Sequence, residues 1–161
     1  MTPVIATCAQ PIGEKCWLTL SRKRHLQWVM PVFTKQWDEP KEPRDGTRIL
    51  VCRYRPRGLR KENETWDAWM PQLGPSVELH AAAYGKKREQ IPWNSYRVAY
   101  LREMRSATES IDALAKRVAA GETITLLCSS ACIRESRCHR SLLKELIEKR
   151  LALSTPSGST F

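Results

Sequence analysis

The side chains with the clearest chemical potential in this chain are arginines at the end of an apolar run. The stretch from Arg48 to Arg60, RILVCRYRPRGLR, contains no acidic residue. Guanidinium groups and free backbone N–H groups at the end of a buried strand suit a phosphate or carboxylate ligand. The sequence therefore predicts an anion-binding turn. Its ligand-binding residues would be Arg53, Arg55, Arg57 and Gly58.

These arginines have two interpretations. If a strand continues through residues 52–57, its alternating arginines project from one face, and Gly58 lets a ligand approach the backbone. Alternatively, some of them pair with nearby carboxylates and fix the segments that follow. The acidic candidates for such pairs are Glu62, Glu64, Asp67 and Glu78.

A second reactive cluster follows the apolar run near the C-terminus, in the sequence CSSACIRESRCHR. Its soft metal ligands lie within twelve residues, at Cys128, Cys132, Cys138 and His139. Zinc or an iron–sulfur centre accepts these residue types. The usual paired spacing is missing, however, and adjacent Cys138 and His139 cannot easily converge on one ion. We therefore favour no metal from the sequence and keep these four residues as candidates.

The same cluster has a thiol interpretation. Cys128 and Arg134 have the spacing of a phosphate-binding cysteine loop, but the glycines typical of such loops are absent. The structural alternative is that Cys128 is a small buried hydrophobe, and that Cys138 lies in the first helical turn, where the positive end of the helix lowers its pKa without function.

The start of the last predicted helix offers better ligand contacts, because unpaired N–H groups there favour anions. The candidates are His139 and Arg140, which we expect to line one pocket with Arg55 and Arg57. Glu78 is the carboxylate we would single out as a general base, with a helix cap or an arginine partner as the alternative. The catalytic candidates are thus Glu78, Cys138 and His139.

Apolar runs predict strands over Leu26–Thr34, Thr47–Tyr54 and Glu122–Cys128. Between Gly58 and Pro75, tryptophans at helical spacing predict short helical pieces. Longer helices are expected from Pro92, from Thr108 to Gly121, and from Cys138 to Leu153. This order predicts an α/β fold, with one three-layer domain and a small, mostly parallel sheet flanked by helices. The arginine turn and the loop after Cys128 would then lie at the same edge of the sheet.

From Val32 onward the chain resembles the YeaO-like bacterial family known as domain of unknown function 488. The resemblance rests on RILVCRYRPRGL, WDAWMPQLGPSVEL, TITLLC and CHRSLL, and on the helix pattern of Trp93, Tyr96, Tyr100 and Glu103. It implies a compact α/β fold and a bacterial, archaeal or phage origin, but no reaction, since the family is functionally uncharacterised. The family usually has an acid at Cys52 and an aromatic residue at Ala83.

The resemblance divides the chain into three parts. Residues 1–31 form an N-terminal extension, with an added edge strand as one option. Residues 32–153 form the YeaO-like domain, and residues 154–161 form a tail that we expect to be disordered because it is short and polar.

The chain has 161 residues, a net charge of +10 and a pI near 9.6. Such charge favours nucleic acid or nucleotides as partners over cations. No secretory leader or membrane span is evident, so we expect a cytoplasmic protein without a membrane partner. In that compartment the six cysteines are expected to be reduced thiols or metal ligands.

The favoured function is binding of nucleic-acid or nucleotide phosphate, in DNA or RNA maintenance, modification or defence. One alternative is a small-molecule enzyme that uses Arg57 and His139, with Cys138 or Glu78, on a phosphorylated or carboxylated substrate. Another is a metal-stabilised binding module that uses Cys128, Cys132 and Cys138. The sequence leaves the cofactor unknown, with zinc as one option. The sequence does not decide whether the protein is an enzyme.

Overall fold

The computed structural model describes residues 32–85 and 89–154. The predicted N-terminal extension therefore lies outside the described residues, as does the first part of the strand predicted over Leu26–Thr34. The predicted tail also lies outside them, except for Ser154, which ends the last helix.

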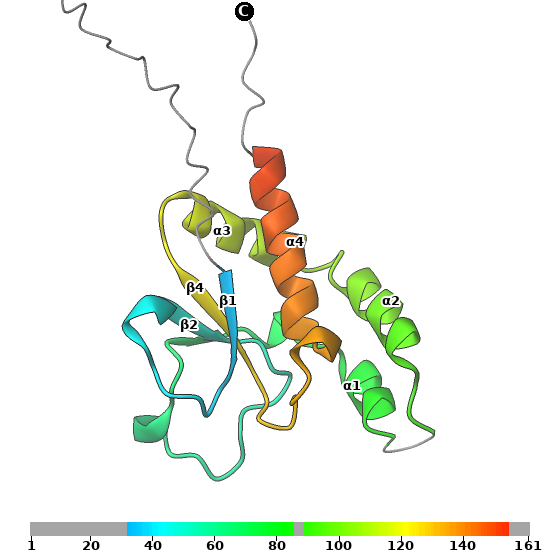
Figure 1. Cartoon of the computed structure of the whole chain (residues 1–161). Helices are drawn as coiled ribbons and strands as arrows, with labels where there is room; N and C mark the ends of the chain where they lie inside the picture. The colour runs from blue at the N-terminus through cyan, green and yellow to red at the C-terminus, as the bar shows by residue number, and fades with distance from the viewer. Residues whose placement is uncertain (1–31, 86–88, 155–161) are drawn as a thin grey trace, which may run out of the picture.

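The core of the domain is a four-stranded sheet in the order β1-β4-β2-β3, of which Figure 1 labels β1, β2 and β4. The strands are β1 (Val32–Gln36), β2 (Thr47–Leu50), β3 (Ala68–Trp69) and β4 (Ile124–Cys128). All three pairings are parallel. The predicted α/β class and parallel sheet are confirmed, and the carboxyl ends of the strands meet at one edge.

Helices cover one face of this sheet. They are α1 (Val77–Ala83), α2 (Trp93–Glu103), α3 (Thr108–Ala119) and α4 (His139–Ser154). Figure 1 shows α3 and α4 side by side. Their apolar side chains pack with the sheet residues Ile49, Val51, Ile124 and Leu126. The helices predicted from Pro92, Thr108 and Cys138 are confirmed, and Gly121, with φ of 101°, follows α3 as predicted.

Connecting segments cover the opposite face. Leu50 and Leu127 pack there against buried Trp66, with Trp37 and Leu59 partly buried around them. These segments include the 3-10 helices η1 (Pro43–Asp45) and η2 (Lys61–Asn63). The third layer of the domain is thus formed by connecting segments and single 3-10 turns rather than by α-helices.

The helical pieces predicted around Trp66, Trp69 and Leu73 are wrong over most of their length. Residues 68–69 form β3, and the helical structure between Gly58 and Pro75 is limited to η2 and a second 3-10 turn, η3 (Pro71–Leu73). The reason is tertiary. The N–H of Asp67 donates to the carbonyl of Arg48 (2.8 Å) and that of Met70 to Leu50 (2.9 Å), which draws the segment onto the edge of β2.

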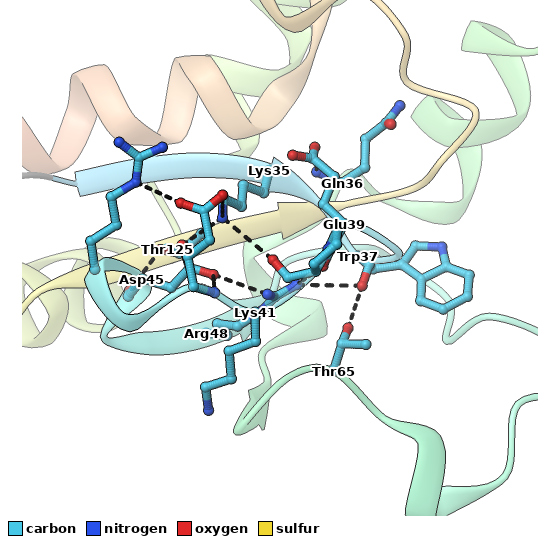
Figure 2. A network of polar contacts seen from close by, with 12 residues as sticks. Lys35, Gln36, Trp37, Glu39, Lys41, Asp45, Arg48, Thr65 and Thr125 are labelled. Atoms are coloured by element: carbon cyan, nitrogen blue, oxygen red, sulfur yellow. Dashed lines mark hydrogen bonds and ion pairs between the residues drawn. The ribbon is translucent and has the colours of Figure 1, made fainter.

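A buried ionic network holds the face that the connecting segments cover (Figure 2). The Asp45 carboxylate accepts from Lys35 Nζ at 2.7 Å and from Arg48 Nη1 at 3.0 Å. Asp45 and Arg48 are both fully buried. A charged pair without water needs further hydrogen bonds to satisfy its remaining polar atoms.

Backbone groups supply those bonds. Arg48 Nη2 donates to the carbonyls of Glu39 (2.8 Å) and Trp37 (3.5 Å), and Thr125 Oγ1 donates to the carbonyl of Asp45 (2.7 Å). The network therefore links β1, β2, β4 and the segment from residue 37 to residue 46.

The same contacts set the ionisation of Asp45. Burial by itself raises the pKa of this carboxyl. The hydrogen bonds from Lys35 and from the backbone N–H of Glu42, with the charges of Lys35 and Arg48, outweigh burial and hold the pKa below its ordinary value. Asp45 therefore remains a carboxylate at neutral pH.

We predict that Asp45→Asn strongly destabilises the fold. The substitution leaves Arg48 buried without its carboxylate partner, and breaking a buried ion pair in this way costs about 3–5 kcal/mol. The measurement is the free energy of unfolding in urea. Glu122→Gln is the control, because its partner Arg117 is part-exposed and such a pair contributes at most about 1 kcal/mol. Equal, small losses in both variants would contradict the role of the network.

The stability of the wild-type chain should also fall in acid. Because the folded-state pKa of Asp45 is lowered, its contribution is complete above the unfolded-state value of about 3.9 and is lost as the pH falls through the folded-state pKa. Urea unfolding measured between about pH 5 and pH 2 should therefore show a steeper loss for wild type than for Asp45→Asn. Parallel curves would contradict this.

Candidate functional site

A large cleft of about 1360 Å³ opens at the carboxyl edge of the sheet. It is lined by the turn after β2, by the loop after β4 and by residues of α1 and α2. The open α/β sheets of many proteins bind ligands at this edge. Among the described residues, no aspartate or glutamate lines the cleft.

Most of the predicted site residues meet in this cleft. Arg53, Arg55 and Arg57 line it from the turn after β2, and Arg134 and His139 line it from the loop after β4 and the start of α4. Arg55, Arg57 and His139, which we expected to share a pocket, therefore line the same cleft. Cys128, Cys132 and Cys138 also line it.

Three predicted site residues lie elsewhere. Glu78 is exposed in the first turn of α1 and does not line the cleft. Gly58 also lies outside the lining, and its φ of 72° shows that it serves the turn geometry. Arg140 is buried rather than presented to the cleft, and its Nε and Nη1 atoms have no hydrogen-bond partner within residues 32–85 and 89–154.

The arginines do not project from one face of a strand, because no strand continues through residues 52–57. The predicted strand Thr47–Tyr54 ends at Leu50 in the structure. The N–H of Val51 still donates to the carbonyl of Leu127 (2.9 Å), but residues 52–58 then form an irregular turn. The arginines reach the cleft through this turn and not from one face of a strand.

The arginines differ in their partners. Arg55 forms an ion pair with Glu64 and lies over the ring of Trp69, 6.0 Å from its centroid, so the structural interpretation holds for this residue. Arg57 and Arg134 are exposed and form no ion pair or side-chain hydrogen bond within the described part of the chain. Arg137, which was not singled out from the sequence, also lines the cleft. It is likewise exposed and without an ion pair or side-chain hydrogen bond in the described residues.

Aromatic rings form another wall of the cleft. The rings of Tyr54 and His80 meet edge to face, with their centroids 5.2 Å apart. The ring centroids of His80 and Tyr84 are 4.7 Å apart. Tyr54 is 52% exposed and Tyr84 is 48% exposed, so each presents part of its ring to solvent. Sequence reasoning missed this wall because its rings come from the arginine turn and α1, with no shared periodicity.

Cysteine sulfurs gather on the inner side of the cleft. The Sγ atoms of Cys128, Cys132 and Cys138 all lie within 4.8 Å of one another. Cys128 Sγ is 3.4 Å from Cys132 Sγ and 3.8 Å from Cys52 Sγ. The participation of Cys52 was not expected from the sequence, because it follows a strand 76 positions away from Cys128.

The sulfurs polarise one another. The hydrogen bond with Cys128, and to a smaller extent that with Cys138, lowers the pKa of the Cys132 thiol. The bond between Cys128 and Cys132 is also the largest cause that raises the pKa of Cys128. For Cys138, the contact with Cys128 lowers the pKa, but the bond to Cys132 and burial together raise it to about 12. The pKa depression expected at Cys138 from the start of a helix is therefore wrong, because its sulfur partners and burial dominate.

His139 is buried and neutral rather than a cationic ligand contact. Its Nε2–H donates to the carbonyl of Val51 at 2.9 Å. Burial lowers the pKa of its imidazole below the ordinary value. Tyr100 packs against the ring, with centroids 5.6 Å apart.

The fold and the site define a class, namely a parallel α/β domain with a cationic cleft at the carboxyl edge of its sheet. Residues 32–151 match the family model DUF488-N3a, described as the active DUF488-N3 subclade, and the chain belongs to the DUF488 family. The chain is 35% identical over 101 residues to "Uncharacterized protein YeaO" of Escherichia coli (strain K12). The matched region covers 63% of this chain and 84% of YeaO. No solved structure matches the chain.

These comparisons confirm the resemblance found in the sequence. Within the described residues, the structure contains no helix with the length and apolar character needed to cross a bilayer.

The arginine turn should be sensitive to a single methyl group at Gly74. A Cβ there would lie 2.7 Å from the N of Arg53 and 3.0 Å from the O of Val51. Gly74→Ala must displace this backbone, and we expect overpacking to cost about 1–3 kcal/mol of unfolding free energy. Urea unfolding measures the effect. Exposed Gln72→Ala is the neighbouring control and should change stability by no more than about 0.5 kcal/mol.

Proposed function

We propose that the cleft binds the phosphate of a nucleotide or of a nucleic-acid strand. The observation that carries this proposal is the convergence of Arg57, Arg134 and Arg137 in one cleft without an internal carboxylate partner in the described residues. Unpaired guanidinium groups held together repel one another, and a phosphate relieves that repulsion with bidentate hydrogen bonds.

The aromatic wall supports a nucleotide over inorganic phosphate. Tyr54 and Tyr84 are half-exposed beside the arginines. Stacking of a base on such a ring contributes about 1–3 kcal/mol and tolerates any sequence. At about 1360 Å³ the cleft also exceeds the volume of about 300–1,000 Å³ typical of small-molecule sites. The cleft therefore has room for a nucleotide unit of a longer strand.

The setting of such a site would be DNA or RNA maintenance, modification or defence in a prokaryotic or phage cytoplasm. The net charge of +10 favours a polyanionic partner. An enzyme of small phosphorylated substrates is the competing proposal, and the description of the matching family as an active subclade is consistent with it. Neutral His139 and the cysteines are the reactive groups that line the same cleft as the arginines for that chemistry.

A second candidate function is metal binding by the cysteine cluster. Three sulfurs from two separate elements and their connecting loop approach within 4.8 Å of one another, which is a specific arrangement and not a consequence of sequence proximity alone. The metal would stabilise the loop that carries Arg134 and Arg137.

The test of phosphate binding is Arg57→Ala combined with Arg134→Ala. The affinity for a fluorescein-labelled single-stranded oligothymidylate should fall by about tenfold or more, because charge-assisted hydrogen bonds contribute about 1.5–3 kcal/mol each. Losing two phosphate contacts should also reduce the magnitude of the slope of log K against the logarithm of the salt concentration by about 1.4. Fluorescence anisotropy over a range of salt concentrations measures both quantities.

Arg102→Ala with Arg105→Ala is the matched control, because it removes the same charge from exposed positions outside the cleft. If both double variants lose the same affinity, binding is diffuse and the proposed site is wrong. Competition with the mononucleotide separates the two substrate classes. A mononucleotide that binds as tightly as the oligonucleotide would favour the small-molecule enzyme.

A further inference from the structure

We propose that the cysteine cluster is a mononuclear zinc site with four sulfur ligands, Cys52, Cys128, Cys132 and Cys138. This inference rests on the second candidate function and goes beyond it, because it specifies the ion, its geometry and a fourth ligand from a different part of the chain. It does not depend on whether the cleft binds phosphate.

The spacing of the sulfurs is the first argument. In a tetrahedral site with Zn–S bonds of about 2.3 Å, neighbouring sulfurs lie about 3.8 Å apart. Cys128 Sγ is 3.8 Å from Cys52 Sγ and 3.4 Å from Cys132 Sγ. A disulfide would need about 2.05 Å, and an iron–sulfur cluster would separate its ligand sulfurs by several intervening atoms. The distances among Cys128, Cys132 and Cys138 therefore fit ligands of a single ion, and Cys52 Sγ lies at the same kind of distance from Cys128 Sγ.

The chemistry of the donors is the second argument. Thiolates select soft or borderline metals, whereas Mg²⁺ and Ca²⁺ require oxygen ligands. No carboxylate lines this cleft in the described part of the chain. Cys128 and Cys138 are buried and Cys132 is partly buried, so the sulfurs are shielded as in closed structural zinc sites.

The fourth ligand is Cys52 and not His139. The two ring nitrogens of His139 lie at nearly equal distances from Cys128 Sγ, 3.9 Å for Nδ1 and 3.8 Å for Nε2, so neither nitrogen is directed at the cluster. Nε2 is already bonded to the carbonyl of Val51. Cys52 Sγ, by contrast, lies 3.8 Å from Cys128 Sγ, the length of a tetrahedral edge. It lies outside the group of three sulfurs that are all within 4.8 Å of one another, so its side chain must rotate toward Cys132 and Cys138 to complete the site.

An ion at this position would connect the elements that build the cleft. Cys52 follows β2, Cys128 ends β4, and Cys138 directly precedes α4. Cys132 and Cys138 bracket the exposed loop that carries Arg134 and Arg137. Zinc with four thiolates carries a net charge of −2, and the arginines that line the cleft would balance it.

The experiment uses the full chain, purified under reducing conditions without chelator. Elemental analysis should find one zinc per chain, and replacement by Co²⁺ should give the intense d–d and thiolate charge-transfer bands of a tetrahedral four-sulfur site. Cys52→Ser should lose zinc stoichiometry or shift these bands. Cys8→Ser with Cys16→Ser is the control and should retain both. Chelator should lower the melting temperature of wild type, because zinc binding contributes to folding.

The outcomes separate the two levels of the proposal. Bound metal with a Co²⁺ spectrum unchanged in Cys52→Ser would overturn the four-sulfur site and leave metal binding itself in place. Metal-free wild type that gives no Co²⁺ bands would overturn both. The wild-type spectrum reports the number of thiolate ligands by itself, so the ligand number can be tested even if Cys52→Ser fails to fold.

Discussion

The buried contact of Asp45 with Lys35 and Arg48, together with the bond from Thr125, joins three strands of the sheet to the segment that covers one of its faces. Without it, Arg48 would lie buried without its carboxylate partner, and Lys35 would keep only the more exposed Glu42. The Arg48 side chain also donates to the backbone carbonyls of Glu39 and Trp37. These bonds hold the long connection from β1 to β2 against the sheet. A layer without α-helices can cover a sheet face only if its backbone groups are satisfied in this way.

The network also reaches the cleft. The carbonyl of Trp37 accepts bonds from Arg48 and Thr65, while its N–H donates to the carbonyl of Cys128 (2.9 Å). Trp37 lines the cleft beside the cysteine cluster. The network is thereby connected to the end of β4 at Cys128, and the parallel topology places the ends of the strands at one edge. Arginines and cysteines from distant segments meet there as a consequence.

Much of this arrangement could be predicted from the sequence. β4, α3 and α4 follow from apolar periodicity and helix-end signals, and parallel strands imply that the arginine turn and the Cys128 loop share an edge. The end of β2 was misplaced because apolar Val51 and Cys52 continue beyond its strand. β3 was missed because long-range backbone bonds to β2 override helical spacing. The contacts of Cys52, and the wall that Tyr54 and Tyr84 form, depend on tertiary packing that no local pattern encodes.

Hydrogen–deuterium exchange of the full chain, with and without a short oligothymidylate, tests whether the arginine turn and the loop after β4 bind one ligand together. Amides of residues 51–58 and of residues 128–139 should gain protection together, because the ligand contacts both segments in one cleft. Protection confined to other segments, or to only one of these two, would contradict a shared phosphate site at the carboxyl edge of the sheet.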